Sequence, residues 1–298
     1  MKRKIISVVL AVVLIFSALA LTSCSSSKKK EITVGSSNFT EVVILGNIYK
    51  LLIEENTDIK VNTSFGLNGA TFCFAALENK DIDMFVEYTG SMLSNVCKQP
   101  MSNDPEQVYN TVKETLDKEH NVYTSAPLGF NNTYIMSVRP ETADKYGLET
   151  LFDLVEVAPE LKLGCTMEFV QRADCLPLFE KTFNTKFKEV SGLDASVRYT
   201  AIESGQVDVI DAFTTDALLV KTGLTSLKDD VNFFPPYYAC NFIRKDTFEK
   251  YPELEELLSK LDGLFDEETM AALNAKVDVE GQNEVTVARE FLEEKGLI

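Results

Sequence analysis

Residues 76–90 read "ALENKDIDMFVEYTG", and residues 201–216 read "AIESGQVDVIDAFTTD". Each stretch is typical of the end of an apolar helix, a polar turn and a short apolar strand with an aspartate before its core. Asp83 matches Asp208 in this comparison, and Tyr88 matches Phe213. Because the similar pieces recur once and far apart, they predict two lobes of related architecture. A solenoid would need several short repeats.

An earlier pair of stretches repeats the same order of elements. "EITVGSSNF" at residues 31–39 and "ELKLGCTMEF" at residues 160–169 each read as an alternating strand, a glycine turn and a following helix. Strands and helices alternate through both halves, which is typical of α/β lobes with mostly parallel sheets.

The chain is expected to cross between the lobes twice, near residues 125–127 and again near residues 230–234. Two crossings make the first lobe discontinuous, with the C-terminal helices returning to it. The predicted first lobe therefore comprises residues 32–125 and 233–298, and the predicted second lobe comprises residues 126–232.

The N-terminus has the pattern of an export signal. A basic start at Lys2, Arg3 and Lys4 precedes an apolar run that is shorter than the ~20 residues of a typical spanning helix. Small residues then lead to Cys24, as in the lipobox of bacterial lipoproteins, whose cysteine becomes diacylated. We therefore expect a signal peptide at residues 1–23 and a flexible tether at residues 24–31. An uncleaved anchor helix is the alternative, and both place the rest of the chain outside the cytoplasm.

Composition excludes several classes of function. The formal net charge is −17, so nucleic acid is not expected as a partner, because binding its phosphates requires clustered Lys and Arg. His120 is the only histidine and lies in a charged segment, and no known catalytic or metal-binding motif occurs. We therefore expect neither an enzyme nor a bound metal or cofactor. The competing hypothesis is an exported enzyme with Cys165 as its nucleophile.

Tyrosines mark the boundaries of predicted elements, where an open α/β sheet presents its ligand-binding loops. The residues are Tyr88, Tyr134, Tyr199 and Tyr237. Ordinary packing is the alternative for each of them, and an aromatic at the matched position Phe213 favours it.

Six motifs in chain order make the sequence resemble one known family, the substrate-binding proteins of osmoprotectant ABC importers, which capture glycine betaine, choline or carnitine. The motifs are "ITVGSSNFTE", "DIDMFVEYTGSML", "LGFNNTYIM", "LKLGC", "YTAIESGQVDVIDAFTTDALL" and "LKDDVNFFPPY". The resemblance covers essentially all of the chain after the signal peptide. It implies a two-lobed clamshell of the type II periplasmic-binding-protein kind, with two crossings between the lobes.

The resemblance also implies a ligand site. In this family tyrosines enclose the quaternary ammonium of the ligand, which implies a cage of Tyr88, Tyr134, Tyr199 and Tyr237 here. Asn132 is implied as a further ligand contact. Ser37 stands where some relatives have a longer amide, and Thr89 is a candidate contact in an adjoining loop. A trimethylammonium has no N–H to donate, so aromatic faces bind it through their quadrupole, and we expect a cage without an acid.

The implied partners are a small quaternary ammonium ligand and an ABC permease in the membrane. We expect a monomer that a lipid on Cys24 anchors to the extracytoplasmic face of the cell membrane. A ligand-sensing receptor module is a further alternative for the same fold.

Overall fold

A computed structural model describes residues 30–171 and 175–298, apart from the side chains of Glu168 and Val220. The predicted signal peptide, Cys24 and all of the predicted tether up to residue 29 lie outside the described residues. Strand β1 (Glu31–Ser37) begins at the last residue of that tether. Residues Ile32–Ile298 pack as one unit, which is described here. No helix in the described part of the chain combines the length and hydropathy that a membrane crossing requires.

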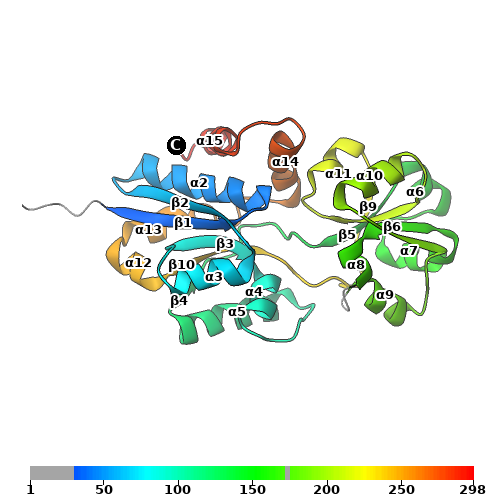
Figure 1. Ribbon diagram of the computed structural model, residues 1–298, viewed down its shortest axis with the longest axis horizontal. Helices are drawn as coiled ribbons and strands as arrows, with labels where there is room; N and C mark the ends of the chain where they lie inside the picture. The colour runs from blue at the N-terminus through cyan, green and yellow to red at the C-terminus, as the bar shows by residue number, and fades with distance from the viewer. Residues whose placement is uncertain (1–29, 172–174) are drawn as a thin grey trace, which may run out of the picture. The chain divides into compact units, whose positions relative to one another are not determined.

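Two five-stranded sheets organise the described residues (Figure 1). The first sheet has the order β2-β1-β3-β10-β4, with β2 at Lys60–Leu67, β3 at Met84–Tyr88, β4 at Val122–Thr124 and β10 at Ala239–Arg244. The second has the order β7-β6-β8-β5-β9, with β5 at Tyr134–Val138, β6 at Lys162–Thr166, β7 at Glu189–Leu193, β8 at Val209–Phe213 and β9 at Thr225–Leu227. We call each sheet with its helices a lobe.

The two sheets share one topology, as the repeated sequence predicts. In each, a parallel pair lies beside one antiparallel strand, which is β10 against β3 in the first lobe and β5 against β8 in the second. Tyr88 pairs with Ala239 at the end of β3, and its match Phe213 pairs with Tyr134 at the end of β8. The α/β two-lobed fold is therefore confirmed, with β10 reaching the first sheet after the second is complete.

The matched aspartates explain why the sequence repeats. Asp83 Oδ2 accepts a hydrogen bond from the amide of Thr33 (2.6 Å), and Asp208 Oδ2 accepts one from the amide of Lys162 (3.0 Å). A matched arginine then binds each carboxylate, Arg244 at 2.6 Å in the first lobe and Arg139 at 3.0 Å in the second. Each aspartate thus joins the start of one strand to the end of an antiparallel one.

Helices cover both faces of each sheet. Those of the first lobe are α2 (Thr40–Asn56), α3 (Ala70–Glu78), α4 (Thr89–Asn95), α5 (Pro105–His120), α12 (Lys245–Lys250), α13 (Glu253–Ser259), α14 (Glu267–Asp278) and α15 (Glu284–Glu294). Those of the second are α6 (Pro140–Tyr146), α7 (Leu151–Val157), a 3₁₀ turn (Ala158–Glu160), α8 (Met167–Gln171), α9 (Leu176–Phe183), α10 (Ala195–Glu203) and α11 (Ala217–Thr222).

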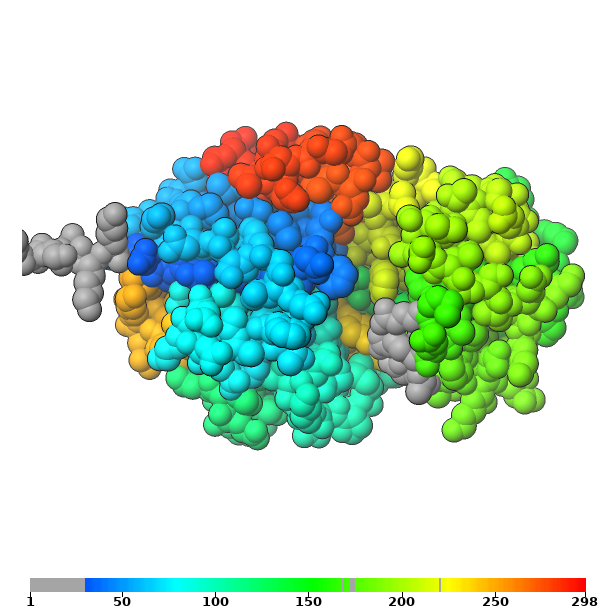
Figure 2. All heavy atoms as spheres, in the orientation of Figure 1, coloured from blue at the N-terminus to red at the C-terminus, as the bar shows by residue number. Residues whose placement is uncertain are grey.

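Helix α2 is apolar on most sides because it packs between the first sheet and α15 (Figure 1). Ile44, Ile48 and Leu52 are fully buried on it. Helix α14 packs on α2 and α15 of the first lobe, and it also contacts α11 of the second lobe. In Figure 2 the orange-red atoms of the C-terminal helices accordingly meet yellow atoms of the second lobe. This helix therefore belongs to the first lobe and contacts the second.

Two segments cross between the lobes, residues 125–133 and residues 228–238. They contain both predicted crossings and run antiparallel, since the amide of Asn132 donates to the carbonyl of Tyr237 (3.0 Å) and Asn131 bridges to Tyr238. Gly129 has φ +117°, and an added Cβ there would collide with the carbonyl oxygen of Phe265. A glycine is therefore required in the first crossing. The exact lobe boundaries stay a prediction.

Candidate functional site

A cavity of about 510 Å³ lies between the two lobes, beside the crossing segments. Its aromatic lining consists of Phe39, Tyr88, Tyr134, Phe213 and Tyr237. Its remaining described lining is polar or small and consists of Thr40, Glu41, Ser91, Asn132, Thr166, Ala195, Thr215, Asp216, Ala217, Asn274 and Asp278. Both lobes contribute, so opening or closing them must change the cavity.

Three of the four predicted cage tyrosines meet at this cavity. Tyr88 ends β3, Tyr134 begins β5, and Tyr237 lies in the second crossing. The ring of Tyr134 also packs against Phe213, with centroids 4.6 Å apart, and against Phe169 at 5.4 Å. This tyrosine therefore belongs both to the core of the second lobe and to the cavity wall.

Phe213 is an aromatic lining residue that the sequence comparison treated only as the counterpart of Tyr88. The register explains its place, because Tyr88 and Phe213 end equivalent strands and so face the same space from opposite lobes. Phe39, at the N-cap of α2, was also missed, and it is 65% exposed. The repeat itself was the signal that could have identified Phe213.

The structure does not bring the other predicted contacts to the cavity. Tyr199, Ser37 and Thr89 are buried and are not among its described lining residues. The hydroxyl of Tyr199 donates to Asp216 Oδ2 (2.8 Å), and Thr89 Oγ1 accepts from the amide of Tyr238 (3.2 Å). Tyr199 thus reaches the cavity wall through Asp216, and direct ligand contact by these three residues stays a prediction.

Asn132 lines the cavity as expected. Its amide donates a hydrogen bond to Glu41, a residue that the sequence analysis did not predict at the site. Its Nδ2 donates to Glu41 Oε1 (3.1 Å) and to the hydroxyl of Tyr88 (3.2 Å). The adjacent Asn131 holds the crossing segments together, because its Oδ1 accepts from the amide of Tyr237 (2.7 Å). The pair of asparagines therefore orients two of the cavity tyrosines.

Glu41, in the first turn of α2, is the main residue that sequence reasoning missed. Its Oε1 accepts from the hydroxyl of Tyr88 (2.5 Å), and its Oε2 accepts from Asn274 Nδ2 (2.9 Å). Burial raises the pKa of Glu41, and hydrogen bonds from Tyr88 and other neighbours act in the opposite direction. The expectation of a cage without an acid is wrong, because this carboxylate lines the cavity beside a cage tyrosine.

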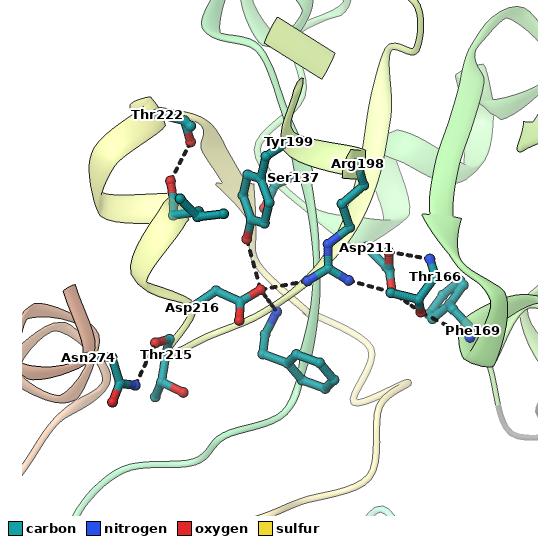
Figure 3. A network of polar contacts seen from close by, with 12 residues as sticks. Ser137, Thr166, Phe169, Arg198, Tyr199, Asp211, Thr215, Asp216, Thr222 and Asn274 are labelled. Atoms are coloured by element: carbon teal, nitrogen blue, oxygen red, sulfur yellow. Dashed lines mark hydrogen bonds and ion pairs between the residues drawn. The ribbon is translucent and has the colours of Figure 1, made fainter. Parts of the chain in front are cut away.

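A second carboxylate, Asp216, lines the cavity from the second lobe. Figure 3 shows its polar contacts. Its Oδ2 accepts from Arg198 (2.6 Å), from the Tyr199 hydroxyl and from the amide of Phe213 (3.1 Å). Arg198 is 1% exposed and also pairs with the buried Asp211 at 3.1 Å. The guanidinium is therefore held between two carboxylates, and it fixes Asp216 at the wall.

The described residues contain no cluster of three or more His, Cys, Asp or Glu side chains suited to a metal ion. The cysteines among them are buried and form no disulfide within the described part of the chain. Burial raises the pKa of Cys165 to about 12, so this thiol is not an activated nucleophile. The alternative of an enzyme that uses Cys165 therefore has no support at this site.

Comparison with known proteins agrees with this geometry. The family model described as the substrate-binding domain of an ABC-type glycine betaine transport system matches residues 30–294. The carnitine transport binding protein OpuCC of Listeria monocytogenes is 34% identical over 300 residues, covering 98% of this chain and 97% of the relative. A crystal structure of a glycine betaine/carnitine/choline ABC transporter aligns with a TM-score of 0.86 and 30% identity, over 89% of this chain and 99% of that one.

Another relative is the ergothioneine transport permease/ergothioneine binding protein EgtU of Helicobacter pylori, which is 36% identical over 285 residues. The match covers 95% of this chain and 51% of the relative, so the chain spans about half the length of that protein. The family match, the relatives and the two-lobed fold together show that the chain belongs to the family of substrate-binding domains of ABC-type glycine betaine transport systems, which are binding proteins and not enzymes.

Proposed function

We propose that this protein captures a quaternary ammonium compound of the glycine betaine, choline or carnitine class between its lobes and delivers it to an ABC permease. The observation that carries the proposal is the lining of the cavity, where aromatic rings from both lobes and the crossing lie beside carboxylates. The relatives' names agree, since carnitine, glycine betaine and ergothioneine all contain a trimethylammonium group.

The aromatic rings supply affinity for a cation that cannot be gripped by hydrogen bonds. Each ring face contributes roughly 0.5–2 kcal/mol toward an onium group, depending on how far the contact is desolvated. Tyr88 comes from the first lobe, Phe213 and Tyr134 come from the second, and Tyr237 comes from the crossing. A ligand that touches all of these rings favours the closed arrangement of the lobes, which is the form that a permease would receive.

The proposed location is the extracytoplasmic face of the cell membrane, with a diacylated Cys24 as the anchor of a monomeric protein. The support is the N-terminal sequence pattern and the family, whose transport systems take up solutes from outside the cell. Metabolic labelling with an alkynyl fatty acid should mark the wild-type chain and leave Cys24→Ser unmarked. Equal labelling of both chains would refute the anchor.

Calorimetric titration of the full chain in mild detergent tests the binding function. Choline, glycine betaine, carnitine and ergothioneine form the panel, and 3,3-dimethyl-1-butanol, the uncharged isostere of choline, is the control ligand. We expect at least one trimethylammonium compound to bind and the isostere not to bind. Failure of the whole panel would overturn the proposal.

A matched pair of variants assigns the binding to the cavity. Tyr88→Ala should weaken binding by about 10-fold or more, because it removes one ring face and a partner of Glu41. Tyr146→Ala truncates a partly buried tyrosine on α6, outside the described cavity lining, and should leave the affinity unchanged. Equal losses in the two variants would indicate an effect on stability and not on the site.

A further inference from the structure

The polar lining of the cavity indicates which kind of trimethylammonium compound fits it. Glu41, Asp216 and Asp278 line the cavity, and no Lys, Arg or His occurs among its described lining residues. A zwitterion such as glycine betaine brings an ionised carboxylate together with its cation. Placed among these side chains, that carboxylate would meet like charges in a partly desolvated space, where repulsion is strong.

The neutral amides at the cavity compensate little, because most of their hydrogens are donated to protein acceptors. Asn132 Nδ2 donates to Glu41 and Tyr88. Asn274 Nδ2 donates to Glu41 Oε2 (2.9 Å) and to the carbonyl of Thr215 (3.0 Å). Asn274 therefore has both of its N–H groups occupied, whereas Glu41 Oε1 and the Tyr88 hydroxyl lie only 2.5 Å apart and share one N–H of Asn132.

The side-chain oxygens of the same two amides, Asn132 and Asn274, are buried acceptors without a hydrogen-bond donor among the described residues. Glu41 accepts from both amides, so the amide nitrogens must face it and the oxygens must face away. These two oxygens are closed off from the cavity space, so a ligand hydroxyl would instead find its acceptor at Asp216, which lines the cavity.

Among the described residues, the guanidinium of Arg198 lies beside the cavity lining, and it is not free to receive a ligand carboxylate. Arg198 is 1% exposed and is held between Asp211 and Asp216 (Figure 3). Releasing it would leave a buried carboxylate without its counter-charge, which is strongly destabilising. Because Arg198 and two further donors fix Asp216 Oδ2, Asp216 presents a preorganised acceptor to the ligand.

We propose that the site selects a net cationic trimethylammonium compound that carries a hydroxyl donor and no carboxylate, as choline does, over zwitterionic betaines. This inference rests on the proposed function, since it concerns the same cavity. Glu41 and Asp216 act as its specificity-determining residues. They favour the onium charge from opposite lobes and repel an anionic end, and no Lys, Arg or His among the described lining residues offsets that repulsion.

The ranking of wild-type affinities is the first test, by calorimetry on the full chain at pH 7. Choline should bind at least about 10-fold more tightly than glycine betaine, carnitine or ergothioneine, which all carry a carboxylate. Equal affinities, or tightest binding of any of the three zwitterions, would overturn the inference while leaving the proposed function intact. Failure of all four to bind would overturn both.

Charge-neutralising variants provide the second test. Glu41→Gln and Asp216→Asn keep the shape of the side chains, and each should reduce the ratio of choline to glycine betaine affinity by several-fold, about 3-fold or more. Asp144→Asn removes the same charge from an exposed position on α6 and should leave the ratio unchanged. An unchanged ratio in both cavity variants, with thermal unfolding showing that they are folded, would contradict the assignment.

Discussion

Glu87 shows how strongly burial controls a single side chain in this protein. It lies on β3 next to the cavity residue Tyr88, is 6% exposed, and its Oε1 accepts from the Tyr88 amide (2.9 Å). Burial raises its pKa from 4.5 to about 7, the bonds from Tyr88 and Ser91 lower it, and the charge of Glu41 raises it. The folded protein therefore holds a proton that the unfolded chain releases at lower pH.

This shift predicts a loss of stability as pH rises. Between pH 4.5 and about 7 the folded state binds more protons than the unfolded state, so the Glu87 contribution to unfolding free energy falls with pH. At pH 8 the ionised side chain costs roughly 3 kcal/mol, and Glu87→Gln should recover most of it while changing little at pH 4.5. Urea unfolding at both pH values measures the difference, with Glu203→Gln on an exposed site as the control. A Glu87→Gln effect that does not depend on pH would contradict the raised pKa.

At the scale of elements, the junction of β3 and α4 depends on one glycine. An added Cβ on Gly90 would lie 2.7 Å from the carbonyl oxygen of Pro236 and 2.8 Å from the ring of Tyr237. Both distances are shorter than ordinary contacts, so either the crossing segment or the ring must move. The helix that begins at Thr89 is thereby fitted to the second crossing.

Gly90→Ala should therefore weaken ligand binding through Tyr237 without a large loss of helix. We expect affinity for a trimethylammonium ligand to fall by about 10-fold, since an aromatic ring of the cavity lining is displaced. Ser94→Ala, one turn further along the same helix, should keep wild-type affinity. Calorimetry on both variants decides the matter, and equal affinities would show that the ring tolerates the methyl group.

The matched aspartates make a parallel prediction for the two sheets. Asp83→Asn and Asp208→Asn each weaken an ion pair to an arginine and a bond to a strand amide. We expect each to lower the unfolding free energy by about 1–3 kcal/mol, because a partly buried arginine loses one counter-charge, although Arg244 keeps Asp246 at 2.8 Å. Chemical denaturation measures both, and Asp144→Asn serves as the exposed control. If only one of the two variants loses stability, the two matched aspartates do not contribute equally to the unfolding free energy.

At the scale of the whole molecule, α14 connects the lobes through Asn274. Its amide donates to Glu41 of the first lobe and to the carbonyl of Thr215 in the second. The same side chain thus links the cavity carboxylate to the relative position of the lobes.

Asn274→Ala should shift the ligand-free protein toward open forms. The expected result in small-angle X-ray scattering is a larger radius of gyration than wild type without ligand, together with weaker binding, because closure loses a bond. Lys276→Ala on the same helix removes only an exposed pair with Glu290 and should scatter like wild type. Identical scattering of Asn274→Ala and wild type would exclude a role in closure.

The sequence predicts the fold well because the decisive residues act locally. Asp83 and Asp208 precede their strands in both repeats, and Tyr88 and Phe213 end them, so the pattern of one lobe identifies the other. The cavity acids are harder to predict. Glu41 and Asn274 are 233 residues apart and meet only in the folded chain. The family resemblance predicts Tyr199 as a ligand contact, but its hydroxyl donates to Asp216, a bond that a local sequence motif does not reveal.

The place of β10 between β3 and β4 has a consequence for how the molecule is made. Residues 134–227 contain every strand of the second sheet. They leave the ribosome before β10, the strand that lies between β3 and β4 in the first sheet. The first sheet therefore cannot be completed until residue 244 has emerged, because β10 is missing between β3 and β4. A nascent chain stalled before that point would expose two unpaired strand edges, which is a state that invites capture by chaperones.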